Sequence, residues 1–110
     1  MATATYKVLG QSAPSATTST DLYTVPSATE AIISTLVIAN RGTTGGTYRV
    51  SVAPDGAALA NSQYIAYDVT LTGNNTTALT LGITVNATDV IRVYASSADF
   101  TFSAFGSEIA

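Results

Sequence analysis

Apolar and polar residues alternate with a period of two along most of this chain, and this pattern predicts β-strands. Tyr48, Val50 and Val52 alternate with polar or small residues, and Ile91 and Val93 begin a similar stretch. No window sustains apolar residues at the i, i+3, i+4, i+7 spacing of an amphipathic helix, and the chain is rich in the β-branched residues that favour strands. We therefore expect an all-β protein.

One segment, Ile32–Ala39, departs from the alternation because it is almost continuously apolar. A strand that is covered on both faces, or that lies at a subunit contact, has this composition. We expect it to be the central strand and, with its neighbour at 47–52, to supply subunit or lattice contacts. The side chains predicted for these contacts are Ile32, Ile33, Leu36, Ile38, Tyr48 and Val50.

Turn residues separate the apolar runs and complete the predicted fold. Glycines in 41–46 suit a hairpin loop, Pro54-Asp55-Gly56 is a strong turn sequence, and Gly73-Asn74-Asn75 predicts another turn. The segment 54–63 has room for a helical turn. About eight short strands are expected, at 6–9, 22–25, 32–39, 47–52, 64–72, 77–81, 90–95 and 100–105. This spacing indicates an antiparallel sandwich or a small barrel. We favour one β-sandwich, jelly-roll or immunoglobulin-like.

The length of 110 residues corresponds to a single domain, 1–110. Residues 11–20 are rich in Ser, Thr and Ala, so 1–20 is predicted to be an extended N-terminal arm that reaches an adjacent subunit. Residues 1–11 lack the basic and apolar regions of a signal peptide. No apolar run approaches the roughly 20 residues of a membrane span, so no membrane contact is expected.

The composition excludes several chemistries. The chain has no Cys, His or Trp, which rules out the usual zinc, haem and iron–sulfur ligand sets and any catalytic triad that uses His as its base. Its four cations are scattered and the net charge is −3, so nucleic-acid binding is not expected. No metal or other cofactor is expected, because the acidic residues are isolated in sequence and lack a calcium-loop pattern.

Charged residues are unusually scarce, at 10% of the chain against about 25% in typical globular proteins. Free monomers normally protect exposed sheet edges with Lys or Pro, and this chain has one Lys. A monomer prone to association is the plain explanation. We favour the other, in which much of the surface is covered in a homo-oligomer or a larger assembly.

Three side chains form the predicted ligand surface: Tyr64, Tyr67 and Asp68, together with the 73–77 loop. Exposed aromatic residues can bind sugars or proteins, although tyrosines also lie at sandwich rims with the ring inside and the hydroxyl in water. A hydrolase that uses paired carboxylates is a further alternative. We do not favour it, because Asp residues at turns and strand ends usually bond to nearby backbone amides.

Five segments resemble small virion-associated proteins of tailed bacteriophages, especially those of phages of cyanobacteria and other aquatic bacteria. They are Tyr-Lys-Val-Leu-Gly-Gln (6–11), Asp-Leu-Tyr-Thr-Val-Pro (21–26), Ser-Thr-Leu-Val-Ile-Ala-Asn-Arg-Gly (34–42), Tyr-Arg-Val-Ser-Val (48–52) and Phe-Gly-Ser-Glu-Ile (105–109). The resemblance covers nearly the whole chain, and its motifs are structural rather than chemical. It implies no catalytic residues.

The resemblance implies a non-enzymatic component of the virion that is assembled in the host cytoplasm. Our first hypothesis is a capsid decoration, or cement, protein that binds the major capsid protein as a homo-oligomer, with a trimer favoured. A tail, baseplate or fibre component is the variant within this class, with tail or baseplate proteins as partners. The second hypothesis is a module that binds a host receptor or glycan.

Overall fold

The structure is a computed structural model that describes residues 3–110. It contains nine strands and two short 3₁₀ turns. They are β1 (Ala4–Ser12), β2 (Thr20–Thr24), β3 (Glu30–Asn40), β4 (Gly46–Ala53), η1 (Pro54–Gly56), η2 (Asn61–Gln63), β5 (Tyr64–Leu71), β6 (Asn75–Leu79), β7 (Ile83–Val85), β8 (Val90–Ala95) and β9 (Phe100–Ile109). The prediction of an all-β chain is confirmed.

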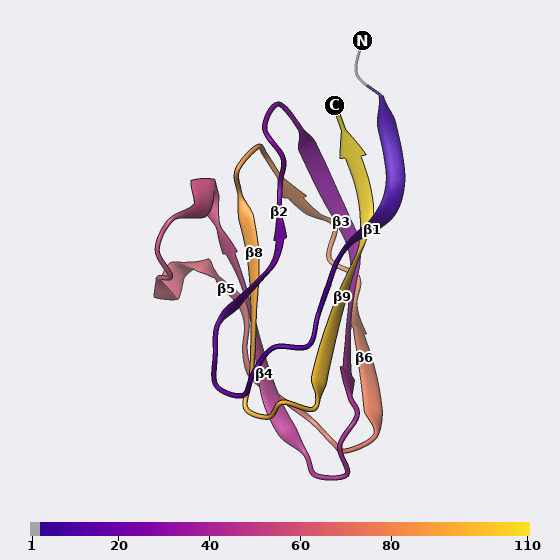
Figure 1. The fold of residues 1–110 in the computed structure, drawn as a ribbon, viewed down its shortest axis with the longest axis vertical. Coiled ribbons are helices and arrows are strands. Elements are labelled where there is room, and N and C mark those ends of the chain that lie inside the picture. The colour runs from indigo at the N-terminus through magenta and orange to yellow at the C-terminus, as the bar shows by residue number, and fades with distance from the viewer. Residues whose placement is uncertain (1–2) are drawn as a thin grey trace.

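Two antiparallel sheets pack face to face, as the edge-on view in Figure 1 shows. Sheet A has the order β1-β9-β3-β6, and β7 also pairs with β3. Sheet B has the order β2-β8-β4-β5. The predicted β-sandwich is therefore confirmed. No helix in residues 3–110 has the length and apolar content needed to cross a membrane.

The structure has a ninth strand, β7, which is not among the eight expected from the sequence. The alternation of Leu79, Leu81 and Ile83 suggests one continuous strand, but Gly82 has a φ of 62° and interrupts it. β6 then pairs with one half of β3 and β7 with the other half. The segment 54–63 does form helical turns, namely η1 and η2.

The core lies between the sheets and explains why β3 is apolar. Five of the six side chains predicted for subunit contacts are within it, each at most 2% exposed: Ile33, Leu36, Ile38, Tyr48 and Val50. Side chains enclosed by their own sandwich do not reach a second subunit, so that prediction is wrong for these five. The sixth, Ile32, lies on the outer face and is exposed. A continuous apolar run cannot reveal which of its residues face inward.

Residues 4–12 of the predicted N-terminal arm instead form an edge strand, β1. β1 pairs with β9 from Ala4 opposite Ile109 to Ser12 opposite Phe102. β9 extends four residues beyond its predicted end at Phe105 and supplies the partner for β1. Residues 13–19 then cross to sheet B. The first two residues of the predicted arm lie outside the described residues.

A buried asparagine joins two loops at the end of the sandwich where β3, β4 and β5 turn. Asn40 donates from Nδ2 to the carbonyl oxygens of Thr44, Leu71 and Thr72, at 2.9, 3.3 and 3.3 Å. Its Oδ1 accepts a hydrogen bond of 3.0 Å from the backbone N–H of Gly42. One side chain therefore satisfies backbone groups of both the β3–β4 and β5–β6 connections.

The turn role expected for the aspartates is clearest at Asp89. Its carboxylate accepts hydrogen bonds from the backbone N–H groups of Asp55, at 2.7 Å, and Asn86, at 2.8 Å. It therefore ties the η1 turn to the turn before β8.

Candidate functional site

The outer face of sheet B carries a cluster of arginine and tyrosine side chains. The Arg49 guanidinium lies between two aromatic rings, 4.2 Å from the ring centre of Tyr67 and 4.3 Å from that of Tyr94. Asp68 accepts hydrogen bonds from Arg49 Nε, at 2.6 Å, and Nη2, at 3.3 Å. This hydrogen bond and the negative charge of Asp68 raise the pKa of Arg49, so the guanidinium stays charged.

The registers of β4 with β8 and with β5 bring these side chains together. Arg49 lies on β4 directly opposite Tyr94 of β8. On the other side, the β4–β5 pairing is irregular, and Asp68 has a φ of 50°. This irregularity places two successive residues of β5, Tyr67 and Asp68, beside one arginine of β4.

Tyr64 extends the cluster toward the 54–63 segment. Its ring centre is 4.8 Å from that of Tyr67, with an interplanar angle of 78° that is typical of edge-to-face aromatic pairs. Nearby, Arg92 donates to Asp21 at 3.1 Å and to the carbonyl oxygen of Ala57 at 2.7 Å. The 54–63 segment is thereby held against the sheet.

The structure thus brings together the three predicted ligand-surface residues Tyr64, Tyr67 and Asp68. It does not bring the 73–77 loop to them, because that loop lies beyond the opposite end of β5 from Tyr64. Sequence reasoning missed Arg49 and Tyr94. The alternation of β4 and β8 places both on outer faces, but only the strand order shows that they are neighbours.

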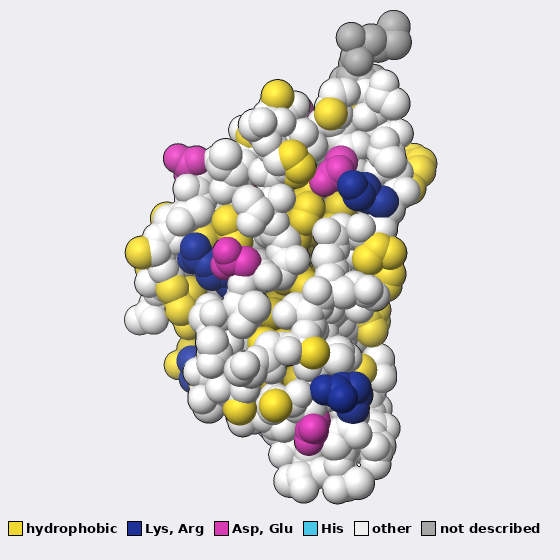
Figure 2. All heavy atoms as spheres, viewed as in Figure 1, with side chains coloured by type: hydrophobic (Ala, Val, Ile, Leu, Met, Phe, Trp, Pro, Cys, Tyr) yellow, Lys and Arg dark blue, Asp and Glu magenta, His cyan; other side chains and the backbone are white. Residues whose placement is uncertain are grey.

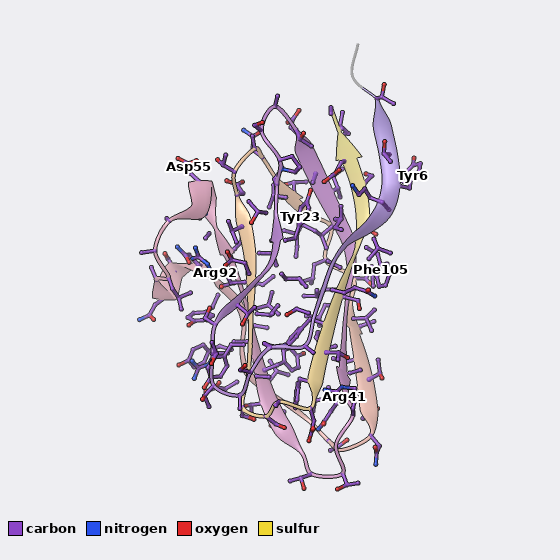
Figure 3. The ribbon with its side chains drawn as sticks, in the orientation of Figure 1. Tyr6, Tyr23, Arg41, Asp55, Arg92 and Phe105 are labelled. Carbon is purple, nitrogen blue, oxygen red and sulfur yellow. The ribbon has the colours of Figure 1, made fainter. Side chains whose placement is uncertain are left out.

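A second surface lies on the outer face of sheet A, and it is apolar. Figure 3 shows Tyr6 and Phe105 on this side, Tyr23 between the sheets, and Arg92 on the side of sheet B. A shallow groove of about 480 Å³ is lined by Tyr6, Lys7, Val8, Ile32, Ser34, Phe105, Gly106 and Ser107. Tyr6 is 87% exposed. We call this surface the sheet A groove.

The sheet A groove adjoins the free edge of β1, which pairs with no other strand in the described part of the chain. The single lysine of β1, Lys7, contacts Glu108 of β9 at 3.0 Å, so its charge is balanced. Figure 2 looks at the edge of the sandwich, and apolar side chains lie along its right-hand rim, on the side of sheet A. An apolar groove beside an unprotected strand edge is typical of a protein contact surface.

No protein-family model and no curated protein matches this chain. Within residues 3–110, no three His, Cys, Asp or Glu side chains lie close enough together to hold a metal ion.

A hydrogen-bonded group beneath β1 makes the fold sensitive to alkaline pH. The Tyr23 hydroxyl donates to Glu108, which also accepts from Lys7. Burial, and then the hydrogen bond and negative charge of Glu108, raise the pKa of Tyr23 above its ordinary value of 10. Because the pKa of Tyr23 is higher in the folded than in the unfolded chain, its hydroxyl contributes stability that is fully present below about pH 10. This contribution is lost as the pH rises toward the folded-state pKa.

We therefore expect the free energy of unfolding to fall above about pH 10. Urea unfolding between pH 8 and pH 12 measures it, and the Tyr23→Phe variant should show a shallower fall. Burial also raises the pKa of Tyr48, so part of the fall should remain. Tyr6→Phe, which removes an exposed hydroxyl, is the control. Identical profiles for Tyr23→Phe and the unmodified chain would contradict this role of Tyr23.

Proposed function

We propose that this chain is a non-enzymatic structural accessory protein of a tailed-phage particle, assembled in the host cytoplasm. In the form we favour, it is a capsid decoration protein that binds the major capsid protein as a homo-oligomer, with a trimer favoured. The observation that carries the proposal is the sheet A groove beside the free edge of β1. The phage resemblance and the scarcity of charge support it.

The mechanism follows from these surface properties. Burial of the apolar side chains of the groove contributes roughly 25 cal/mol for each Å² removed from water. The free N–H and C=O groups of β1 can pair with a strand of a neighbouring subunit. Several copies in one oligomer would bind a repeating shell together, so the affinity of each copy can be modest. Such contacts would reinforce the shell against the pressure of packaged DNA.

Self-association provides a direct test of the sheet A groove. We expect the purified chain to be oligomeric at micromolar concentration, and the Val8→Lys, Ile32→Lys double variant to be a monomer. The two added lysines on each copy would repel those of the neighbouring copy. Their ammonium groups would also lose their hydration in the contact. Light scattering after size exclusion gives the mass.

The matched control for that test is Ile65→Lys, which adds a charge at an exposed apolar residue of the other sheet. It should leave the oligomer unchanged. A monomeric wild-type chain, or a double variant that keeps the wild-type mass, would argue against the groove as the subunit contact. Circular dichroism should confirm that both variants are folded.

A tail, baseplate or fibre component that binds a host receptor or glycan is the second candidate function. The arginine–tyrosine cluster on the outer face of sheet B favours it, because exposed aromatic residues with adjacent hydrogen-bonding groups are common in recognition surfaces. Binding of the purified chain to host cells would support this candidate. The decoration function would instead give binding to shells that lack the protein.

A further inference from the structure

A pocket opens on the outer face of sheet B, between the strands and the 54–63 segment. Its volume is about 190 Å³. Its lining includes Arg49, Ser51, Leu59, Tyr64, Arg92 and Tyr94. We call it the Ser51 pocket, because Ser51 lies on the strand beneath it and is only 2% exposed. It is smaller than the roughly 300–1,000 Å³ of pockets for drug-sized ligands, so it suits one small ring.

The charges around the Ser51 pocket are balanced within the protein. The Arg49 guanidinium is paired with Asp68. Arg92 is paired with Asp21 and also donates to the carbonyl oxygen of Ala57. An anionic ligand would have to compete with these carboxylates, and the net charge of −3 would repel it. The pocket therefore offers hydrogen-bonding groups without a net positive charge.

Aromatic and hydroxyl groups make up much of the remaining lining. Tyr64 and Tyr94 supply rings, Leu59 supplies an apolar side chain, and Ser51, Thr17 and Ser19 supply hydroxyls. A hydroxyl donates one hydrogen bond and accepts two, which matches the hydroxyls of a sugar. The apolar C–H face of a pyranose packs on rings such as those of tyrosine.

Tyr64 also lines a second, more open depression on the same face. This depression has a volume of about 350 Å³ and is lined by Asn61, Tyr64 and Tyr67. Tyr64 therefore lines both hollows, of which the second is the more open. Two linked rings of a chain ligand would occupy such a pair of hollows side by side.

From this chemistry we infer that the Ser51 pocket binds one sugar residue of a neutral saccharide, and that the next residue lies over Asn61 and Tyr67. This inference deepens the second candidate function, because a surface saccharide is a ligand that a host-binding component would take. It does not require the sheet A groove. Its ligand class is a neutral oligosaccharide rather than a phosphate or an acidic sugar.

The test uses amide chemical shifts of the ¹⁵N-labelled full chain. The probes are glucose, galactose, mannose and N-acetylglucosamine, the disaccharides cellobiose and lactose, and glucuronate as the charged comparison, each to roughly 10 mM, above the millimolar Kd expected of a weak site. We expect at least one neutral sugar to shift amides at Ser51, Leu59 and Tyr64, with a tighter Kd for a disaccharide.

Two variants separate this site from nonspecific binding. Tyr64→Ala removes the ring that lines both hollows and should weaken binding about tenfold or more. Tyr6→Ala removes an exposed tyrosine of sheet A and should bind as the unmodified chain does. Spectra of both variants without sugar verify the fold.

Three results would overturn the inference: no shifts with any neutral sugar, equal binding by Tyr64→Ala, or tighter binding of glucuronate than of every neutral sugar. Failure here leaves the decoration function intact, because oligomer formation and shell binding are measured without saccharide. Conversely, saccharide binding by a chain that never joins a particle would support the pocket and contradict the proposed particle role.

Discussion

The Gly106→Ala variant should lose about 3 kcal/mol or more of stability, a large part of the roughly 5–15 kcal/mol by which a small domain is stable. A Cβ added at Gly106 would overlap the carbonyl oxygen of Ile32 and would lie 3.1 Å from Cα of Ile33. Both atoms belong to the backbone of β3, so no side-chain rotation relieves the clash. β3 and β9 would have to separate at the centre of sheet A.

The cause lies in the register of these two strands. The β3–β9 pairing shifts between Ile33 and Thr35, and Gly106 is the partner of Ile33 at this irregularity. A bulge brings the two backbones too close for a side chain, and glycine is the residue that permits such an approach.

Guanidinium unfolding monitored by far-UV circular dichroism measures the effect. The control is Gly45→Ala, because the nearest atom to a Cβ there is 3.6 Å away, an ordinary contact. The control should stay within about 1 kcal/mol of wild type. A Gly106→Ala protein that matched the control would show that the close β3–β9 approach is wrong.

The Asn40→Asp variant should lose about 3–5 kcal/mol at pH 7. Nδ2 of Asn40 donates to three carbonyl oxygens, and a carboxylate oxygen in its place would face the same three acceptors without a proton. The site is 2% exposed, so water cannot compensate. The hydrogen bond from the Gly42 N–H to the side-chain oxygen would remain, so the variant measures the loss of the Nδ2 donor alone.

The pH dependence has a definite sign. Burial and the surrounding carbonyl oxygens would raise the pKa of the introduced carboxyl above its unfolded value of about 4. The destabilisation should therefore be largest near neutral pH. It should shrink as the pH falls toward the unfolded-state pKa of about 4. Thermal unfolding at pH 7 and pH 4 measures this change.

Asn61→Asp is the matched control, since Asn61 is exposed at η2. It should change stability by less than about 0.5 kcal/mol. If Asn40→Asp were as stable as Asn61→Asp at pH 7, Asn40 would not join the two loops as described.

Strand positions were predictable because side chains on a strand alternate between two faces, and this period is visible in β4 and β8. The orientation of β3 was not, because both of its faces are apolar: Ile33 enters the core while Ile32 stays outside. The sequence predicts a strand only over 6–9 and an arm over 1–20, because residues 11–20 are rich in Ser, Thr and Ala, whereas β1 runs from Ala4 to Ser12. Its pairing with β9 depends on a contact about a hundred residues away in sequence.

The candidate site was predictable only in part. Tyr64, Tyr67 and Asp68 are close in sequence, so their proximity needs no knowledge of strand order. Arg49 and Tyr94 join them only through the order β8-β4-β5 and the irregular register at Asp68. The Ser51 pocket needs in addition the 54–63 segment folded over the sheet, a placement that its own sequence does not specify.

Under the proposed function, this chain is part of a phage particle and coats its shell. Immunogold electron microscopy, with an antibody to this chain, tests it most directly on particles produced from the genome that encodes the chain. The decoration function predicts gold scattered over the head, and label confined to the tail or baseplate would select the second candidate function instead. Particles without label, and without this chain by mass spectrometry, would contradict the particle role altogether.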